Sequence, residues 1–301
     1  MTGASQPPTV AAPGASPPRQ PLPPGACDVH SHVFGPFDRF APSAPSVYAL
    51  PEATPDVHAK IRTKLGFARG VLTQAAPYGF DPSALLNAIA GSAGALKAVA
   101  AADSTVSDTT LAAWKRDGIV GLRFVEARAP GGVRYPGSVG FDQFVVLAPR
   151  MREHGLHAQL WAGTDEYREW LPRLLLLGVP LVLDHMGKPD PARGVADPGF
   201  QLLLAALREA RVWVKLSICR VSSAAPDYAD VRPLHDALVE ANPDRLLWGS
   251  DWPYVRLTPA PDAGHLLDVF DAWTGDAALR TRILVDNPAR LYGFDAVARP
   301  V

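Results

Sequence analysis

The feature that most constrains the fold is a regular alternation of short apolar stretches with longer segments of helical periodicity, which begins at Ala26 and runs to the end of the chain. The short stretches are rich in β-branched residues, as buried strands are. They number eight, at residues 27–34, 70–74, 96–102, 121–125, 156–162, 180–186, 212–217 and 245–252. Candidate helices with apolar residues at helical spacing fall at residues 82–92, 107–118, 166–178, 199–211, 228–242 and 264–273.

This alternation predicts an α/β protein in which helices cover a parallel sheet. Eight strand–helix units in about 250 residues fit a closed (β/α)8 barrel, the TIM barrel. The alternative is an open doubly wound sheet, but no GxGxxG fingerprint follows the first strand. Residues 276–294 predict a terminal helix, a break at Asn287–Pro288 and a short helix that ends at Gly293. We therefore predict one barrel domain over residues 25–301.

Residues 1–24 have a different composition, dominated by Pro, Ala, Gly and Ser. Such a segment has little apolar surface whose burial could offset the entropy lost on ordering the chain. We expect a disordered or polyproline-like tail that carries no chemistry.

Charge and cysteine content limit the class of protein. The 29 basic and 30 acidic residues nearly balance, which argues against binding to nucleic acid or to a membrane surface and favours a small-molecule substrate. The only cysteines, Cys27 and Cys219, lie far apart in the sequence, which favours the reducing cytoplasm over a secreted disulfide scaffold. We find no apolar run long enough to cross a membrane and no secretory signal. Whether the chain forms a homo-oligomer is left open.

Polar residues at the ends of three predicted strands need a functional explanation, because active sites of such barrels lie at the carboxyl ends of the strands. His30 and His32 are two residues apart on the first strand and would face the barrel mouth together. Two adjacent imidazoles suit a metal ion or hydrogen bonds to an oxyanion. The alternative is a pair of polar residues on an edge strand.

The sixth and eighth strands end in His185 and Asp251. His185 could bind a metal or polarise a carbonyl group, or it could be a structural histidine. Its neighbour Asp184 would point the other way, into the structure. Asp251 is placed to act as a general base toward water, the alternative being a helix cap or loop residue.

These motifs occur together and in a fixed order: DVHSHVFG, LGFARGVLTQ, VGLRFV, LDHMGKPD, LLWGSDWP and VDNPARLYGF. In this order they resemble the amidohydrolase superfamily, and more narrowly its branch of 2-pyrone-4,6-dicarboxylate lactonases and sugar-acid lactonases. The resemblance covers approximately residues 26–294. It implies a lactonase, a hydrolase that opens a carboxylated cyclic ester in aromatic-compound or sugar-acid catabolism.

The resemblance also implies residue roles. Asp251 would take a proton from water, and His185 would stabilise the oxyanion that develops on the lactone carbonyl. His30 and His32 would complete this catalytic site. The substrate carboxylates would be held by Arg123, Arg220, Tyr48 and Arg128. Arginine suits this task because its planar fork pairs with a carboxylate through two hydrogen bonds, although each arginine could instead form a surface ion pair.

A binuclear metal centre is not expected. Amidohydrolases with two metals generally use a carbamylated strand lysine and further histidines, whereas the fourth strand here offers Arg123 and the fifth ends in Trp161. Some members of the lactonase branch work without metal, and we expect no cofactor. The alternative is one zinc or manganese ion, held by His30, His32, His185 and Asp251.

Two further functions remain as alternatives. A metal-dependent decarboxylase of the same superfamily would share the paired histidines, the later histidine and the final aspartate. A barrel that only binds a ligand is the other alternative, although it would be expected to have lost at least one of these residues.

Overall fold

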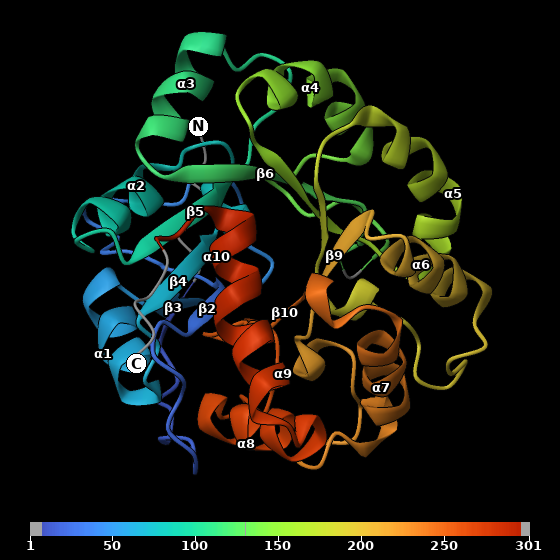
Figure 1. The fold of residues 1–301 in the computed structure, drawn as a ribbon. Coiled ribbons are helices and arrows are strands. Elements are labelled where there is room, and N and C mark those ends of the chain that lie inside the picture. Colours follow the sequence, from blue (N-terminus) through green and yellow to red (C-terminus); the bar gives the residue numbers. More distant parts are fainter. Residues whose placement is uncertain (1–7, 130, 296–301) are drawn as a thin grey trace.

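In the computed structural model, which describes residues 8–129 and 131–295, the strands form a closed parallel barrel with helices outside it (Figure 1). The eight-stranded sheet runs in sequence order from β2 to β10, every pair parallel. It closes where Val29 N–H donates to the Trp248 carbonyl at 3.1 Å and Ser31 bridges Trp252. The strands are β2 (Cys27–Ser31), β4 (Arg69–Thr73), β5 (Leu96–Ala100), β6 (Ile119–Val125), β7 (His157–Trp161), β8 (Leu181–Leu183), β9 (Val212–Lys215) and β10 (Leu246–Leu247).

The predicted barrel and all eight of its strands are confirmed. The main helices are α1 (Pro55–Leu65), α2 (Ser83–Ala90), α3 (Asp108–Arg116), α4 (Phe141–Glu153), α5 (Thr164–Leu174), α6 (Pro198–Arg208), α7 (Arg232–Ala241) and α8 (Ala263–Thr274). Of these, α1 and α4 were not predicted. Within the described part of the chain, no helix has both the length and the apolar character needed to cross a bilayer.

The terminal segment differs from the prediction in one respect. Helix α9 (Ala277–Thr281) passes through a π-helical turn, Arg282–Asp286, directly into α10 (Asn287–Tyr292). The helical segment continues through Asn287–Pro288 without a break, with the π-helical turn immediately before Pro288. Gly293 ends the helix with a φ of 69°, as predicted.

The interior of the barrel is apolar at the end covered by α10 and polar at the opposite end. Val29, Val71, Val99 and Val182 form a buried cluster that Tyr292 of α10 closes from below. The register of β2 against β4 shifts between Asp28 and Ser31. Such an irregularity re-aims the side chains beyond it, so that the valine layer is followed by histidines that face the mouth.

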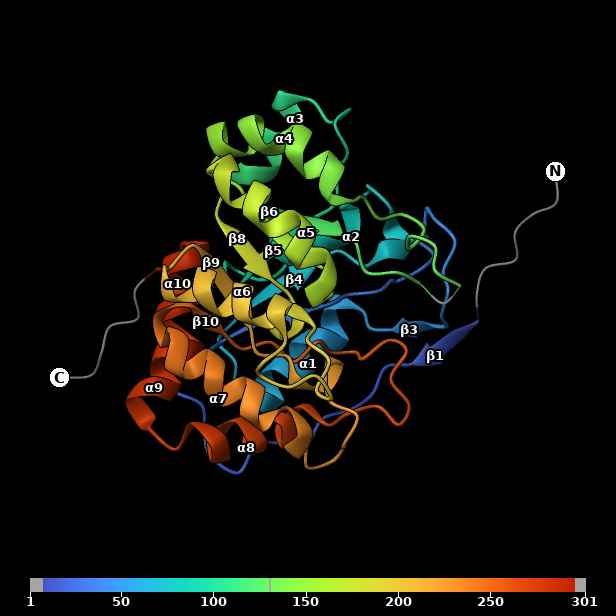
Figure 2. The same ribbon diagram turned by 90° about the vertical axis from the view of Figure 1, so that its right-hand side faces the viewer.

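The N-terminal segment is ordered where the structure describes it, which differs from the predicted disordered tail. Strand β1 (Thr9–Ala11) pairs with β3 (Leu50–Glu52) beyond the mouth of the barrel, opposite α10 (Figure 2). The indole N–H of Trp252 donates to the Pro13 carbonyl at 2.8 Å, and Ser16 N–H donates to Asp262 at 3.0 Å. Hydrogen bonds to the barrel order this segment, which the low apolar content could not indicate. Residues 1–7 lie outside the described residues.

Candidate active site

Six of the predicted residues line one pocket of about 470 Å³ at the mouth of the barrel: His32, Tyr48, Arg123, His185, Arg220 and Asp251. His30 lies directly beneath it and is fully buried. Arg128 is not brought into this pocket: its guanidinium is half exposed and pairs with Glu126 at 3.5 Å. Most of the residues named from the sequence therefore lie together, although they come from six separate segments.

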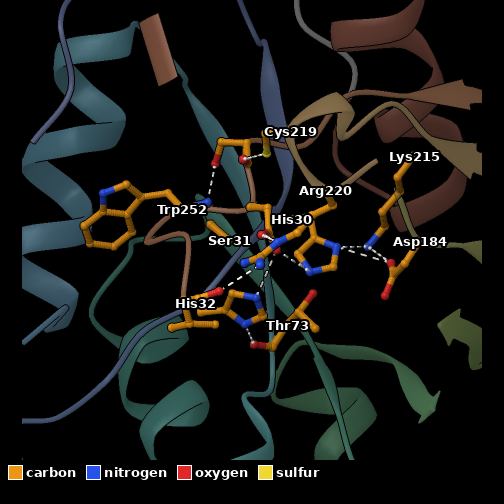
Figure 3. Close-up of polar contacts among 12 residues, drawn as sticks. His30, Ser31, His32, Thr73, Asp184, Lys215, Cys219, Arg220 and Trp252 are labelled. Atoms are coloured by element: carbon orange, nitrogen blue, oxygen red, sulfur yellow. Dashed lines mark hydrogen bonds and ion pairs between the residues drawn. The ribbon is translucent and has the colours of Figure 1, made fainter. Parts of the chain in front are cut away.

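Asp251, His30 of β2 and His32 just after β2 form the centre of the site. The Nε2 atoms of His30 and His32 each lie 3.4 Å from Oδ1 of Asp251. The His30 and His32 rings meet edge to face with centroids 5.1 Å apart. Figure 3 shows His30 between His32 on one side and the Lys215–Asp184 pair on the other.

The hydrogen bonds of the two histidines fix what they offer to the pocket. His32 Nδ1 lies 2.7 Å from the Thr73 carbonyl oxygen, which can only accept, so His32 carries a proton on Nδ1, and its Nε2 faces Oδ1 of Asp251 at 3.4 Å. His30 Nδ1 lies between Oδ1 of Asp184 at 3.2 Å and Nζ of Lys215 at 3.3 Å. If Nδ1 donates to Asp184, Nε2 of a neutral His30 ring is a lone pair; if Nδ1 accepts from Lys215, Nε2 carries the proton and faces Oδ1 of Asp251 at 3.4 Å.

The backbone holds Asp251 in a left-handed conformation with a φ of 62°. A non-glycine residue rarely adopts such a conformation unless its surroundings impose it. Here its N–H donates to the His30 carbonyl at 2.7 Å, which joins the end of β10 to β2. The preceding residue is fixed in the same way, because the Ser250 hydroxyl donates to Asp28 at 2.5 Å and its N–H to the same carboxylate at 3.0 Å. The position of the proposed base is therefore determined by two adjacent strands.

The electrostatic surroundings keep Asp251 ionised. Burial alone would raise its pKa, but the Nε–H of Arg220 donates to Oδ2 and His32 contacts Oδ1, so the pKa lies well below its ordinary value. His185 is in the opposite state, since burial lowers its pKa to about 3 and leaves a neutral imidazole at neutral pH. The pocket thus combines an anionic carboxylate with a neutral histidine.

A layer of buried charges supports the site from below. Lys215 Nζ donates to Oε1 of Gln159 at 2.7 Å and lies 3.3 Å from Oδ1 of Asp184. The other oxygen of Asp184 accepts from Arg123 at 3.3 Å and from Gln159 at 3.1 Å. Burial lowers the pKa of Lys215 to about 8. Asp184 thus connects His30 to Arg123, a role that the sequence did not indicate beyond placing this carboxylate inside the structure.

Two residues in one wall of the pocket, Tyr135 and Arg256, were not named by the sequence interpretation. Tyr135 stacks on Trp161 with ring centroids 5.2 Å apart. The guanidinium carbon of Arg123 lies 5.0 Å from the centroid of the Trp161 ring. Arg256 lies over Tyr135 at 5.3 Å and also lines the pocket. Arg256 follows the WGSDWP motif by three residues, which was the only signal available for it.

The geometry of the donor atoms fits a single metal ion. One ligand atom from each of His30, His32 and Asp251 lies within 4.8 Å of the others, and all three residues are buried. Two imidazole nitrogens and a carboxylate oxygen are a common set for a divalent cation, with His185 as a further nitrogen donor nearby. The sequence-based expectation of no cofactor therefore stays a prediction.

The barrel and the histidine–aspartate cluster at its mouth define the class of protein, an α/β-barrel enzyme. A family model described as amidohydrolase matches residues 27–294, and the chain belongs to this family.

Two relatives and one solved structure are similar to this chain over most of its length. The chain is 35% identical over 288 residues to a 2-pyrone-4,6-dicarboxylate hydrolase of Comamonas testosteroni, covering 92% of this chain and 93% of the relative. It is 33% identical over 276 residues to a 4-sulfomuconolactone hydrolase of Hydrogenophaga intermedia, covering 90% of each. A crystal structure from Acinetobacter baumannii, described as a probable 2-pyrone-4,6-dicarboxylic acid hydrolase with citric acid bound, superposes with a TM-score of 0.77. That protein is 27% identical and covers 90% of this chain and 100% of its own.

Proposed function

We propose that this protein hydrolyses a lactone that carries anionic groups, such as a dicarboxylated 2-pyrone or a sugar-acid lactone. The observation that carries the proposal is the pocket itself, in which an ionised Asp251 faces a neutral His185 beside two arginines. The named activities of the relatives agree with it, since both act on cyclic esters.

The reaction follows from the charges of these groups. Asp251 accepts a proton from water while the water oxygen bonds to the lactone carbonyl carbon, whose π electrons move to oxygen. His185 faces the resulting oxyanion and stabilises it by donating a hydrogen bond. The tetrahedral intermediate then collapses, the bond to the ring oxygen breaks, and Asp251 returns its proton to that oxygen. The product is a carboxylic acid, which loses its proton to solvent to become a carboxylate, together with a free hydroxyl or enol group.

Arginine and tyrosine side chains hold the substrate in this proposal. Arg123 and Arg220 each keep N–H groups free after their bonds to Asp184 and Asp251, and the hydroxyl of Tyr48 faces the same pocket. A carboxylate placed between the two guanidinium groups would set the lactone carbonyl beside His185. Arg128 remains a weaker candidate, reached only if its loop moves toward the mouth.

We further propose that the reaction proceeds without a metal. A bound divalent ion, held by His30, His32 and Asp251, would supply Lewis-acid activation of water or carbonyl. However, Arg220 already neutralises Asp251, and a second guanidinium lines the same pocket, which disfavours a dication there. An activated ester is also easier to open than an amide, so histidine and arginine suffice to stabilise the oxyanion.

The test is hydrolysis of a lactone panel before and after exhaustive treatment with a chelator, with the metal content of each sample measured. The panel includes 2-pyrone-4,6-dicarboxylate and sugar-acid lactones. We expect turnover on at least one anionic lactone that survives the loss of metal. Turnover that disappears with the metal and returns with zinc or manganese would contradict the metal-free mechanism, and no turnover on any lactone would contradict the function.

The remaining proposals concern the binding partners of the protein and its location in the cell. A small molecule is the partner that the pocket suits, and we propose a cytoplasmic enzyme, in keeping with two free, buried cysteines. Nucleic acid and membrane partners have no support in the charge balance of the chain.

A further inference from the structure

We propose that Arg256 binds a second anionic group of the substrate, on the side of the pocket away from the reacting ester, and thereby selects dianionic over monoanionic ligands. This inference rests on the proposed function of the pocket and adds a specificity residue to it. Arg256 lies in the segment between β10 and α8 and was not a candidate from the sequence.

The backbone around Arg256 directs it to the pocket. Its own φ is 69°, a left-handed conformation that a long side chain seldom adopts. The residues before and after it are held, because Arg220 Nη1 donates to the Val255 carbonyl at 2.7 Å and Leu257 N–H donates to the Tyr254 carbonyl at 2.9 Å. Arg220, which holds Asp251, thus also fixes the segment that carries Arg256.

The aromatic wall holds the guanidinium in place. Arg256 lies 5.3 Å from the centroid of the Tyr135 ring, which stacks on Trp161, which in turn contacts Arg123 at 5.0 Å. A guanidinium that rests on a ring loses little entropy on binding a ligand and keeps its N–H edges free to donate to a carboxylate. The wall therefore presents one arginine at each end of an aromatic pair.

Arg256 differs from the other two pocket arginines in its charge balance. Arg123 pairs with Asp184 and Arg220 with Asp251, whereas among the described residues no carboxylate pairs with Arg256. All three guanidinium groups act on Tyr48, where burial is the larger influence and raises the pKa while their positive charges oppose it. They therefore converge on one side of the pocket, and only Arg256 still lacks an anion.

The total charge of the site points to the same class of ligand. Four cations, including Lys215 beneath the pocket, face the two carboxylates Asp184 and Asp251, which leaves an excess of two positive charges. A dianion balances this excess, with one group between Arg123 and Arg220 and the other at Arg256. A monoanion would leave Arg256 uncompensated.

The experiment compares two ligands that differ by one carboxylate. Binding of isophthalate and of benzoate is measured by calorimetry for the wild type, Arg256→Met, Arg256→Lys and Arg245→Met. The last variant is the matched control, because Arg245 also rests on an aromatic ring, Trp213 at 4.6 Å, but at the opposite end of the barrel. Kinetics with 2-pyrone-4,6-dicarboxylate and 2-pyrone-6-carboxylate are run in parallel.

We expect Arg256→Met to weaken isophthalate binding by about 10- to 100-fold, the value of a hydrogen bond to a charged group, and to change benzoate binding less than about twofold. Arg256→Lys should recover part of the loss, and Arg245→Met should resemble the wild type. In kinetics the loss should appear in KM for the dicarboxylate with kcat nearly unchanged.

Equal binding of isophthalate by the wild type and Arg256→Met, or equal losses for both ligands, would overturn the inference. So would a wild type that binds isophthalate no more tightly than benzoate. The proposed function fails separately, if no lactone is opened by the wild type, because the binding assay does not depend on turnover.

Discussion

The two halves of the barrel interior are built from the same eight strands but follow opposite rules. The half next to α10 is filled by branched apolar side chains such as Val71, Val99 and Val182, whose burial stabilises the fold. The half next to the mouth buries Lys215 and Asp184, both with no exposed surface. Burying charges is unfavourable unless they are paired, and such pairs seldom add stability over an apolar packing. The residues that stabilise the barrel and the residues proposed to react with substrate thus lie at opposite ends of the same strands.

The largest effect should come from the base at the mouth. Replacing Asp251 by Asn removes the proposed general base, and we expect kcat for lactone opening to fall by about 100- to 10,000-fold. Circular dichroism should stay close to that of the wild type, whereas the midpoint of thermal unfolding should fall, because Arg220 loses its buried carboxylate partner. Asp244→Asn, at the other end of β10, is the control and should retain full activity. Comparable kcat values for Asp251→Asn and the wild type would remove Asp251 from the mechanism.

Breaking the buried pair of Lys215 and Asp184 should have the next largest effect, which is a loss of stability. Lys215→Met leaves Asp184 buried with too little positive charge, and we expect a loss of about 3–5 kcal/mol in the free energy of unfolding. Adding Asp184→Asn removes that unpaired charge and should recover part of the stability but not the activity. Urea titration of the single and double variants checks this. A double variant no more stable than Lys215→Met would mean that the pair is not what limits stability here.

A change in the apolar half should act on stability alone. Val71→Ala removes two buried methyl groups from the valine cluster next to α10, and we expect a loss of about 2 kcal/mol in the free energy of unfolding. Because Val71 lies away from the mouth, kcat and KM should remain within about twofold of the wild type. The same urea titration and a lactone assay test both halves of this statement. A large fall in kcat would show that the two halves are coupled.

The last prediction concerns the loss of stability in acid. Burial lowers the pKa of His157, in the lower half, to about 3, whereas the unfolded chain titrates near 6.5. Between these values the unfolded state binds a proton that the folded state does not, so stability present above pH 6.5 is lost as the pH falls toward 3. His157→Gln should reduce the slope of unfolding free energy against pH by about 1.4 kcal/mol per unit. An unchanged slope between pH 6 and pH 4 would contradict the neutral state of His157.

The barrel was predictable because strand and helix periodicities are local properties of the sequence. The helices α1 and α4 were not predicted, and the internal Pro149 of α4 does not explain this, because α5 contains Pro172 and was predicted. The four residues at strand ends were predictable for a similar reason, since active-site residues of a barrel lie at the carboxyl ends of its strands. The network of Lys215, Asp184 and Gln159 was not, because it depends on the register of three strands.

The arginines proposed to hold the substrate show the same limit. Arg123 lies on a strand, and the structure brings it into the pocket as expected. Arg128 and Arg256 lie in loops, where the direction of a side chain depends on backbone angles and neighbours from other segments. The sequence interpretation accordingly named Arg128, and the structure places Arg256 at the pocket instead.

The most direct test of the account is ring opening in ¹⁸O-labelled water, with 2-pyrone-4,6-dicarboxylate as substrate and the product analysed by mass spectrometry. Hydrolysis predicts a product heavier than the lactone by one labelled water, with the label in the newly formed carboxylate. A product lighter by carbon dioxide would identify a decarboxylase, and a product of unchanged mass would identify an isomerase. Either result would contradict the central claim that Asp251 delivers water to a lactone carbonyl.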